Sequence, residues 1–566
     1  MKSPFTEINT PEPKAVFRFF REISEIPRPS GSEEKISNYL VDFAHRRGLE
    51  VYQDELFNVI MIKEASAGYE AEPPIILQGH MDMVCEKTAD CTKDMQKEGL
   101  DLMLEGDWLS ADGTTLGGDD GIAVAMALAL LDDDTLQHPR LEFVCTVSEE
   151  TGMEGASGID LSVLRGRRLL NLDSEDEGIF LAGCAGGGNI CFRKTYASDA
   201  GRMAGTKFAP ESSDANQPGQ AKLPSESSFC RVEIGGLTGG HSGSEIHKNR
   251  ANAHKVLGEI LFSVCFSMEG MYNAANEPGG YKKLAAMLGC PPEEANSSGF
   301  KEQVNQFASG VHRGISLVSV SGGTKDNAIP RTAEAILSIP GEVRALFESV
   351  VEMSGQAMRE RFKETDPSFF VKISGIRTPQ EKEDFIAAGQ QGKFLSFIET
   401  MDVLTFLTMV PNGVIEMSKD VPGMTETSLN LGVFRLQDRM LYGESLLRSQ
   451  NNDKFAELKK KAFAFADKIQ AKAEVKSEYP AWEYVKESPL RDKLCRIYKE
   501  ETGREPKVTV IHAGVECGLL SEKIPGLDAV SMGPDILDIH TPEERLSVSS
   551  AERTYRLVRR FIEDRE

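Results

Sequence analysis

Several apolar runs of this chain end directly in side chains that can bind a metal ion or transfer a proton. The positions that share this order are His80 to Asp82, Glu149 to Glu150, Asp173 to Asp176, and Asp538 to His540. Histidine nitrogen and carboxylate oxygen are the ligands expected for zinc in a hydrolytic site. Two adjacent glutamates can divide the work, because one can bind metal while the other transfers a proton. These residue types therefore predict hydrolysis assisted by bound metal ions.

A further acidic pair, Asp119 and Asp120, lies between glycines in the segment Leu116 to Gly121. The flanking glycines allow a tight turn and a close approach of the backbone. Either aspartate would lie at the start of the helix predicted over Gly121 to Leu131, where the helix dipole favours an anion. Taken alone, Asp120 fits a helix cap better than a metal ligand. The local pattern leaves both roles open.

The elements that must position these residues alternate between strand and helix. The predicted strands are Asn58 to Lys63, Ile75 to Gln78, Leu141 to Val147, Arg168 to Asn171, Lys507 to Ile511 and Ala529 to Met532. The predicted helices include Ala15 to Ile26, Glu33 to Arg47, Asp453 to Ala473 and Pro489 to Thr502. This order predicts an α/β fold with a mainly parallel sheet. Ligands bind outside the carboxyl ends of such strands, so we expect the histidines and carboxylates above to meet in one region.

At 566 residues the chain exceeds one ordinary hydrophobic core, so we expect more than one domain. The segment 199–228 is rich in Gly, Ser, Pro, Ala and Asn and reads as a linker, and 270–299 resembles an insertion. A smaller α+β pattern begins after 199–228, is interrupted by 270–299 and continues after that segment. The α/β pattern then returns at Leu404 to Val410. We predict one discontinuous α/β domain made of 1–197 and 404–566, with an α+β domain of 198–403 inserted into it.

Charge and composition limit the partners and the compartment. The net charge of −24 repels phosphate backbones and argues against nucleic acid. The longest apolar stretch, Gly121 to Leu131, is too short to span a bilayer, which argues against a membrane partner. No signal peptide is visible in Met1 to Pro13, and the ten cysteines form no C-x-x-C pair. We therefore expect a cytoplasmic protein with reduced thiols.

Taken together, the motifs resemble those of the co-catalytic dinuclear zinc exopeptidases. The residues that carry this resemblance are His80-Met81-Asp82, Gly118-Asp119-Asp120-Gly121, Glu149-Glu150-Thr151-Gly152, Asn171-Leu172-Asp173 and His540. Further strings are similar to the bacterial aminoacyl-histidine (cytosolic nonspecific) dipeptidase branch of that family: Gly239 to Gly243, Asp326 to Arg331, Pro411 to Val414, Glu426 to Gly432 and His512 to Gly518. The resemblance runs from residue 15 to the C-terminus. It departs at Asp120, where the dipeptidase pattern often has Asn, and in the length of 199–228 and 270–299.

The resemblance implies two zinc ions, with cobalt or manganese as alternatives, and small peptide substrates. Asp119 would bridge the ions, with His80 and Asp173 completing one site and Glu150 and His540 the other. Asp82 would fix the orientation of His80, and Glu149 would be the general base toward a water bound by the two metals. His241 would stabilise the oxyanion, often from the other subunit of a homodimer, and Asn327 and Arg331 would contact the substrate. The smaller domain would serve as a lid and dimerisation domain.

The resemblance leaves other interpretations open. The same chemistry could serve an aminotripeptidase or an N-acyl-amino-acid amidohydrolase, because substrate choice depends on the shape of the pocket. A non-catalytic binding protein of the same fold would have lost a ligand or the base, whereas all of these residues are present. The sequence also gives no G-x-S-x-G elbow and no H-E-x-x-H helix, so other hydrolytic mechanisms lack support. Glu426 and Glu516 lie in matching strings, and no role follows for either.

Overall fold

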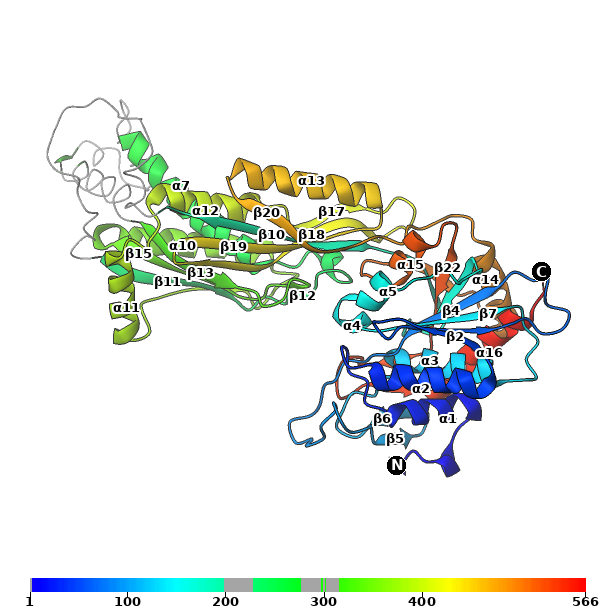
Figure 1. Cartoon of the computed structure of the whole chain (residues 1–566). Coiled ribbons are helices and arrows are strands. Elements are labelled where there is room, and N and C mark those ends of the chain that lie inside the picture. The colour runs from blue at the N-terminus through cyan, green and yellow to red at the C-terminus, as the bar shows by residue number, and fades with distance from the viewer. Residues whose placement is uncertain (1–2, 198–226, 276–296, 299–300, 302–314, 566) are drawn as a thin grey trace. The chain divides into compact units, whose positions relative to one another are not determined.

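The structure is a computed structural model that describes residues 3–197, 227–275, 297–298, 301 and 315–565. The chain forms two compact units (Figure 1). Unit 1 comprises Met1–Gly186, Gln450–Asn452 and Tyr479–Glu566, and unit 2 comprises Gly187–Ser449 and Asp453–Glu478. Most of the predicted linker 199–228 and of the predicted insertion 270–299 lies outside the described residues. Among the described residues, no helix is both long enough and apolar enough to cross a membrane.

The two units divide the chain differently from the predicted boundaries after residue 197 and before residue 404. Unit 2 begins at Gly187 and extends to Ser449, with a return through Asp453–Glu478. The apolar run that begins at Leu404 is the second half of helix α12 (Phe397–Met409), and its buried side chains belong to the core of unit 2. Helix α13 (Asn452–Lys468) also packs into that core. The assignment of these segments to the first domain is therefore wrong.

The main sheet of unit 1 contains eight strands. In spatial order they are β2 (Glu50–Gln53), β3 (Val59–Lys63), β7 (Leu141–Thr146), β4 (Ile75–His80), β8 (Arg168–Asn171), β22 (Asp528–Ser531), β9 (Ile179–Cys184) and β21 (Lys507–Ile511). The pairs β7–β4, β4–β8, β8–β22 and β9–β21 are parallel, and β2–β3, β3–β7 and β22–β9 are antiparallel. The four central strands β7, β4, β8 and β22 therefore run in one direction and end at the same edge.

Both faces of this sheet are covered, which is why the central strands are apolar throughout. One face packs against helices α1 (Lys14–Ser24), α2 (Glu34–Arg47), α3 (Gly118–Asp132), α14 (Pro489–Thr502) and α16 (Val548–Glu563). The other face packs against α15 (Cys517–Lys523) and the segment around Trp482. Every residue of α3 from Gly121 to Leu131 is buried, as its uniformly apolar sequence requires.

A smaller antiparallel sheet in unit 1 contains five strands. In spatial order they are β1 (Ser3–Pro4), β5 (Leu102–Glu105), β6 (Trp108–Ala111), β24 (Arg545–Ser547) and β23 (Ile536–Leu537). Two short helices, α4 (Glu149–Gly152) and α5 (Glu154–Gly158), follow β7. Strands β23 and β24 border the loop 538–544, so this sheet holds both ends of the segment that carries His540.

Unit 2 is a nine-stranded sheet covered by helices. Its strands are β16 (Phe370–Ser374), β11 (Ser227–Gly235), β15 (Ala333–Pro340), β13 (Ser316–Gly322), β18 (Thr425–Gln437), β19 (Met440–Ser449), β10 (Gly186–Thr195) and β20 (Lys472–Tyr479), with β17 (Gly413–Met417) paired to β18. Helices α7 (Ala253–Ala275), α10 (Gly341–Arg361), α12 and α13 share one core with it. Helix α11 (Pro379–Gln390) contributes Phe385 to a separate apolar cluster with Phe229 of β11. A separate ribbon pairs β12 (Gly240–His241) with β14 (Ala328–Ile329).

Candidate metal centre

The candidate ligands lie at the edge where the central strands of unit 1 end. His80 is the last residue of β4, and Asp173 lies two residues beyond the end of β8. Glu150 lies in the short helix that follows β7, and Asp119 lies at the start of α3. His540 comes from the loop after β23. Parallel pairing aligns the strand ends, so segments far apart in the sequence bring their side chains to one place.

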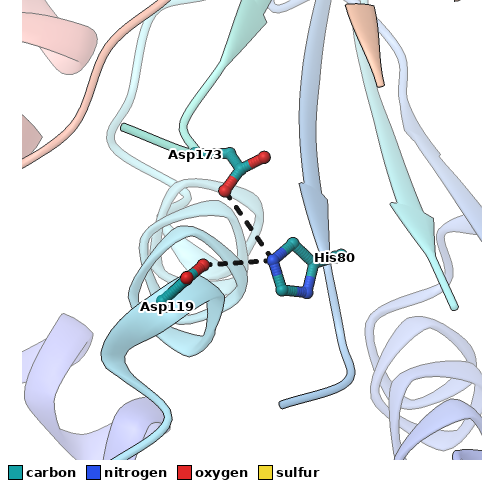
Figure 2. A group of neighbouring side chains, drawn as sticks. All are labelled: His80, Asp119 and Asp173. Atoms are coloured by element: carbon teal, nitrogen blue, oxygen red, sulfur yellow. Dashed lines mark hydrogen bonds and ion pairs between the residues drawn. The ribbon is translucent and has the colours of Figure 1, made fainter. Parts of the chain in front are cut away.

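The five side chains form two groups that share Asp119. In the first group, Nε2 of His80 lies 3.1 Å from Oδ1 of Asp119 and 3.7 Å from Oδ1 of Asp173 (Figure 2). In the second, Nε2 of His540 lies 3.2 Å from Oδ2 of Asp119 and 2.9 Å from Oε1 of Glu150. Within each group the possible ligand atoms lie within 4.8 Å of one another. The two oxygens of Asp119 therefore face different histidines, which is the arrangement of a bridging carboxylate.

The electrostatics of this cluster fit bound cations. Oε1 of Glu150 is buried, and Nε2 of His540 lies 2.9 Å from it. Burial and the neighbouring Asp120 raise the pKa of Asp173 well above its usual range. Removing several carboxylates from water side by side is costly unless opposite charge is present. Three carboxylates and two imidazoles are a ligand set that suits two divalent cations, so the residues present fit the metals that the sequence predicts.

Both candidate histidines are held by carboxylates. Burial lowers the pKa of His80, but its hydrogen bonds to Asp119 and Asp82 raise it further, to well above its usual range. Hydrogen bonds to Asp119 and Glu150 raise the pKa of His540 to about 10. A metal ion binds neutral imidazole, so metal binding here would release protons from both rings.

Asp82 is a fully buried carboxylate that contacts four other residues. Its Oδ1 lies 3.3 Å from Nδ1 of His80, so Nε2 of that ring is directed toward Asp119. Asp82 also accepts hydrogen bonds from the backbone N–H groups of Glu149 (3.1 Å) and Glu150 (3.3 Å), and from the hydroxyl of Ser30 (2.8 Å). A carboxylate behind a ligating histidine fixes its tautomer and orientation.

Glu149 lies beside the ligands without belonging to either group. Burial raises the pKa of Glu149 to about 8, opposed by His80 and assisted by the negative charge of Glu516. Cations in the neighbouring sites would lower this value again. A carboxyl group that titrates near neutral pH is suited to accepting and returning a proton.

Asp120 takes neither of the two roles that the sequence leaves open. Its Oδ2 accepts a hydrogen bond from the backbone N–H of His80, at 3.1 Å, and no side chain caps α3. The peptide bond between Asp119 and Asp120 is cis, and neither residue has helical backbone angles. The structure thus separates the pair: Asp119 faces the histidines, and Asp120 holds the backbone of one of them.

The remaining predicted site residues lie in unit 2. His241 and Asn327 are brought together by the β12–β14 ribbon, where the backbone carbonyl of Asn327 accepts a hydrogen bond from the backbone N–H of Ser242 at 2.8 Å. Nδ1 of His241 accepts hydrogen bonds from the backbone N–H groups of Gly243 (3.3 Å) and Ser244 (3.1 Å). The ring proton is therefore on Nε2, which leaves a donor for another group. The side chains of Asn327 and Arg331 are exposed.

Sequence reasoning missed three buried residues that hold the loops of the metal centre. Glu544 accepts hydrogen bonds from the backbone of residues 116–119, and Arg28 donates to the carbonyl of Gly117. Glu33 accepts hydrogen bonds from both the backbone N–H and the hydroxyl of Ser148. Glu544 follows His540 by four residues, and this proximity was the one available signal. Arg28 and Glu33 carry none, because their contacts join segments far apart in the chain.

Glu516, for which the sequence suggests no role, lies beneath the metal centre. Its Oε2 accepts hydrogen bonds from Nε2 of Gln78 (2.5 Å) and from the hydroxyl of Thr146 (2.6 Å). Gln78 in turn accepts a hydrogen bond from Nδ2 of Asn171, at 2.5 Å. This network crosses β7, β4 and β8 close to their carboxyl ends. It therefore supports the strand ends from which His80 and Asp173 project. Glu426 instead forms an ion pair with Lys454 in unit 2.

Comparison with known proteins agrees with this geometry. Residues 76–564 match the model of peptidase family M20/M25/M40. The chain is 29% identical over 559 residues to the cytosol non-specific dipeptidase of Escherichia coli (strain K12), covering 99% of each chain. It also resembles the crystal structure of aminoacylhistidine dipeptidase from Vibrio alginolyticus, with a TM-score of 0.75 and 28% identity over 99% of this chain and 98% of that one.

Proposed function

This chain belongs to peptidase family M20/M25/M40, and from that membership we propose that it is a cytoplasmic dipeptidase that uses two zinc ions. Its substrates would be dipeptides of the Xaa-His type and others of similar size. The similarity to a non-specific dipeptidase and to an aminoacylhistidine dipeptidase over nearly the whole chain supports this substrate class. The observation that carries the proposal is the pair of ligand groups that share the two oxygens of Asp119.

In the proposed centre, His80 and Asp173 would hold one ion and Glu150 and His540 the other, and Asp119 would contribute to both. When bound, two divalent cations lower the pKa of a shared water and polarise the scissile carbonyl. Glu149 would accept a proton from the attacking water and pass it to the leaving amine. Its place directly before Glu150 in α4, where its backbone N–H donates to Asp82, and the raised pKa of its carboxyl group support this role.

His241, Asn327 and Arg331 would act on the substrate itself. The proton on Nε2 of His241 is free to stabilise a developing oxyanion, because both neighbouring backbone N–H groups point at Nδ1. Arg331 is exposed and could bind the substrate carboxylate through two parallel hydrogen bonds. Unit 2 would then serve as the lid domain.

We also propose a homodimer formed through unit 2. Helix α12 of this unit exposes two large apolar side chains, Ile398 (77% exposed) and Met409 (66% exposed). The proposal of a homodimer rests on the family resemblance, and these two side chains are candidates for burial between the two copies. Light scattering of the purified chain would give its mass directly, and a monomer at micromolar concentration would contradict the dimer.

The proposed function is tested by metal analysis together with a substrate panel. Purified protein should contain two zinc ions per chain and hydrolyse β-alanyl-histidine and glycyl-histidine. The panel should also include tripeptides and N-acetyl amino acids, which an aminotripeptidase or an N-acyl-amino-acid amidohydrolase would prefer. A clear preference for either of these classes would overturn the dipeptidase assignment, and activity that resists chelators would overturn the metal-dependent mechanism.

A further inference from the structure

Glu544 is a buried residue whose carboxylate accepts four hydrogen bonds from the backbone of another segment. The residue is 2% exposed and lies four positions after His540. Its Oε2 accepts hydrogen bonds from the N–H groups of Leu116 (2.8 Å) and Gly117 (2.9 Å). Its Oε1 accepts hydrogen bonds from the N–H groups of Gly118 (2.8 Å) and Asp119 (3.3 Å). One side chain therefore fixes four consecutive peptide groups, and the last of them belongs to Asp119.

The opposite side of the same loop is held by Arg28, whose guanidinium group is also fully buried. Nη2 of Arg28 donates to the carbonyl oxygen of Gly117 at 2.6 Å. Nη1 donates to the carbonyl oxygens of Met81 (3.0 Å) and Asp82 (3.1 Å), which directly follow His80. The loop 116–119 is thus clamped between an anion on its N–H side and a cation on its carbonyl side. The cation also joins it to the segment that carries the first histidine.

The two glycines of this loop are explained by the clamp. Gly117 has φ of +63°, and a Cβ atom there would lie 2.6 Å from Nη2 of Arg28. A Cβ atom at Gly118 would lie 3.2 Å from Oε1 of Glu544. Any larger residue at these positions would push the loop away from one side of the clamp or the other.

The clamp also links the two ligand groups. The segment from His540 to Glu544 is a short turn, closed by the N–H of Glu544 donating to the carbonyl of Thr541 at 3.1 Å. The same turn therefore supplies the histidine of the second group and fixes the backbone of Asp119, which belongs to both. Ligand atoms must lie within about 0.2 Å of their proper distances to bind zinc well, so small shifts of Asp119 would affect both ions.

We propose that Glu544 is a positioning residue that sets the spacing of the two metal ions by clamping the Asp119 loop to the His540 turn. This inference rests on the proposed dinuclear centre. A purely structural role, in which Glu544 only satisfies the first N–H groups of α3, would affect stability and leave the metals unchanged. Metal affinity and the metal spectrum therefore separate the two roles.

The test compares Glu544→Gln with Glu543→Gln in the full chain. Glutamine at position 544 keeps the size of the side chain and one acceptor oxygen, but it turns an amide N–H group toward two backbone donors. Glu543 is the control position because it is adjacent and its side chain is exposed. The measurements are zinc per chain at buffered free zinc, the visible spectrum of the cobalt-substituted protein, kcat, KM and the thermal midpoint. For Glu544→Gln we expect both zinc ions to bind about 10- to 100-fold more weakly, an altered cobalt spectrum, and a fall in kcat with little change in KM. Glu543→Gln should match the parent chain.

The outcomes distinguish the inference from the proposed function. If the parent chain holds two zinc ions and hydrolyses dipeptides, and Glu544→Gln matches it in affinity, spectrum and kcat, the positioning role is wrong and the proposed function stands. If the parent chain binds no zinc, both are wrong. If Glu544→Gln does not fold, Glu544→Asp decides by the same measurements. Aspartate keeps the charge but is too short to reach all four N–H groups, so parent-like metal binding by it would equally overturn the role.

Discussion

His254 of helix α7 should make unit 2 sensitive to acid. Its side chain is fully buried, with its ring centroid 6.0 Å from that of Phe434. Burial, assisted by the positive charge of Arg435, lowers the pKa of His254 to about 3. In the unfolded chain the ring titrates near 6.5, so above that pH it is neutral in both states and contributes nothing. As the pH falls below 6.5 only the unfolded chain gains the proton, and stability is lost progressively until the folded ring titrates near 3.

The magnitude follows from the difference between the two pKa values. From pH 6.5 down to pH 5, a span of about 1.5 pH units, the ring is protonated in the unfolded chain and neutral in the folded chain. This difference lowers the free energy of unfolding at pH 5 by about 2 kcal/mol. The perturbation is His254→Gln, which removes the titration from the unfolded chain. The loss of stability between pH 7.5 and pH 5 should be about 2 kcal/mol smaller in the variant than in the parent. Other titrating groups cancel in this comparison of differences.

The assay is urea unfolding of the chelated protein, followed by two probes. The two tryptophans, Trp108 and Trp482, both lie in unit 1, so their fluorescence reports that unit, while far-ultraviolet circular dichroism reports both. The substitution should change the pH dependence of the unfolding of unit 2 alone. Circular dichroism detects that transition, and tryptophan fluorescence does not. His247→Gln, at an exposed histidine of unit 2, is the control and should behave as the parent. Equal acid sensitivity of His254→Gln and the parent would refute the reasoning.

Three further predictions concern the metal centre and its support. Glu149→Gln should lower kcat by about 10²- to 10⁴-fold while zinc content stays at two per chain, and loss of zinc in this variant would argue against a role restricted to proton transfer. His540→Ala should lose the zinc held with Glu150 but retain that held with His80, as measured by metal analysis after dialysis, and retention of both ions would remove His540 from the ligand set. Gly79→Ala would place a Cβ atom 2.8 Å from that of Ala123. This overpacking should lower the free energy of unfolding by about 1–3 kcal/mol, as measured by urea titration. Unchanged stability would show that the strand can shift to accommodate the methyl group.

The elements with strong periodicity could be predicted from sequence because their burial is regular. Helix α14 and strands β8 and β21 have the predicted bounds, and β4 extends only two residues further, to His80. The apolar run at Leu404 was misassigned because a short apolar run fits a buried strand or a buried helix equally well. The deciding signal was local: Ser396 and Glu399 form a capping box that starts α12 eight residues before that run.

The unit boundaries could not be predicted, because they depend on which core a helix joins. The exposed face of α13 gives no information about its partner, and its buried side chains would suit either core. Packing in unit 2 decides the matter, since Phe455 and Leu458 share a cluster with the strands of that unit. Composition shifts mark linkers, but here the crossing between units occurs within a glycine-rich run at Gly186, where β9 is followed directly by β10.

The sequence by itself was sufficient to predict a shared metal site, because histidines and carboxylates follow the buried strands of an α/β fold. The local pattern did not distinguish Asp119 from Asp120, and only the resemblance assigned the bridging role to Asp119; the tertiary structure gives the physical reason. Asp120 is directed to the N–H of His80 and Asp119 to both histidines, through contacts that close only when the strands pair. The roles of Glu544 and Arg28 likewise become visible only in the tertiary structure. Their partners are backbone groups, which every residue carries, so no residue type along the chain could reveal them.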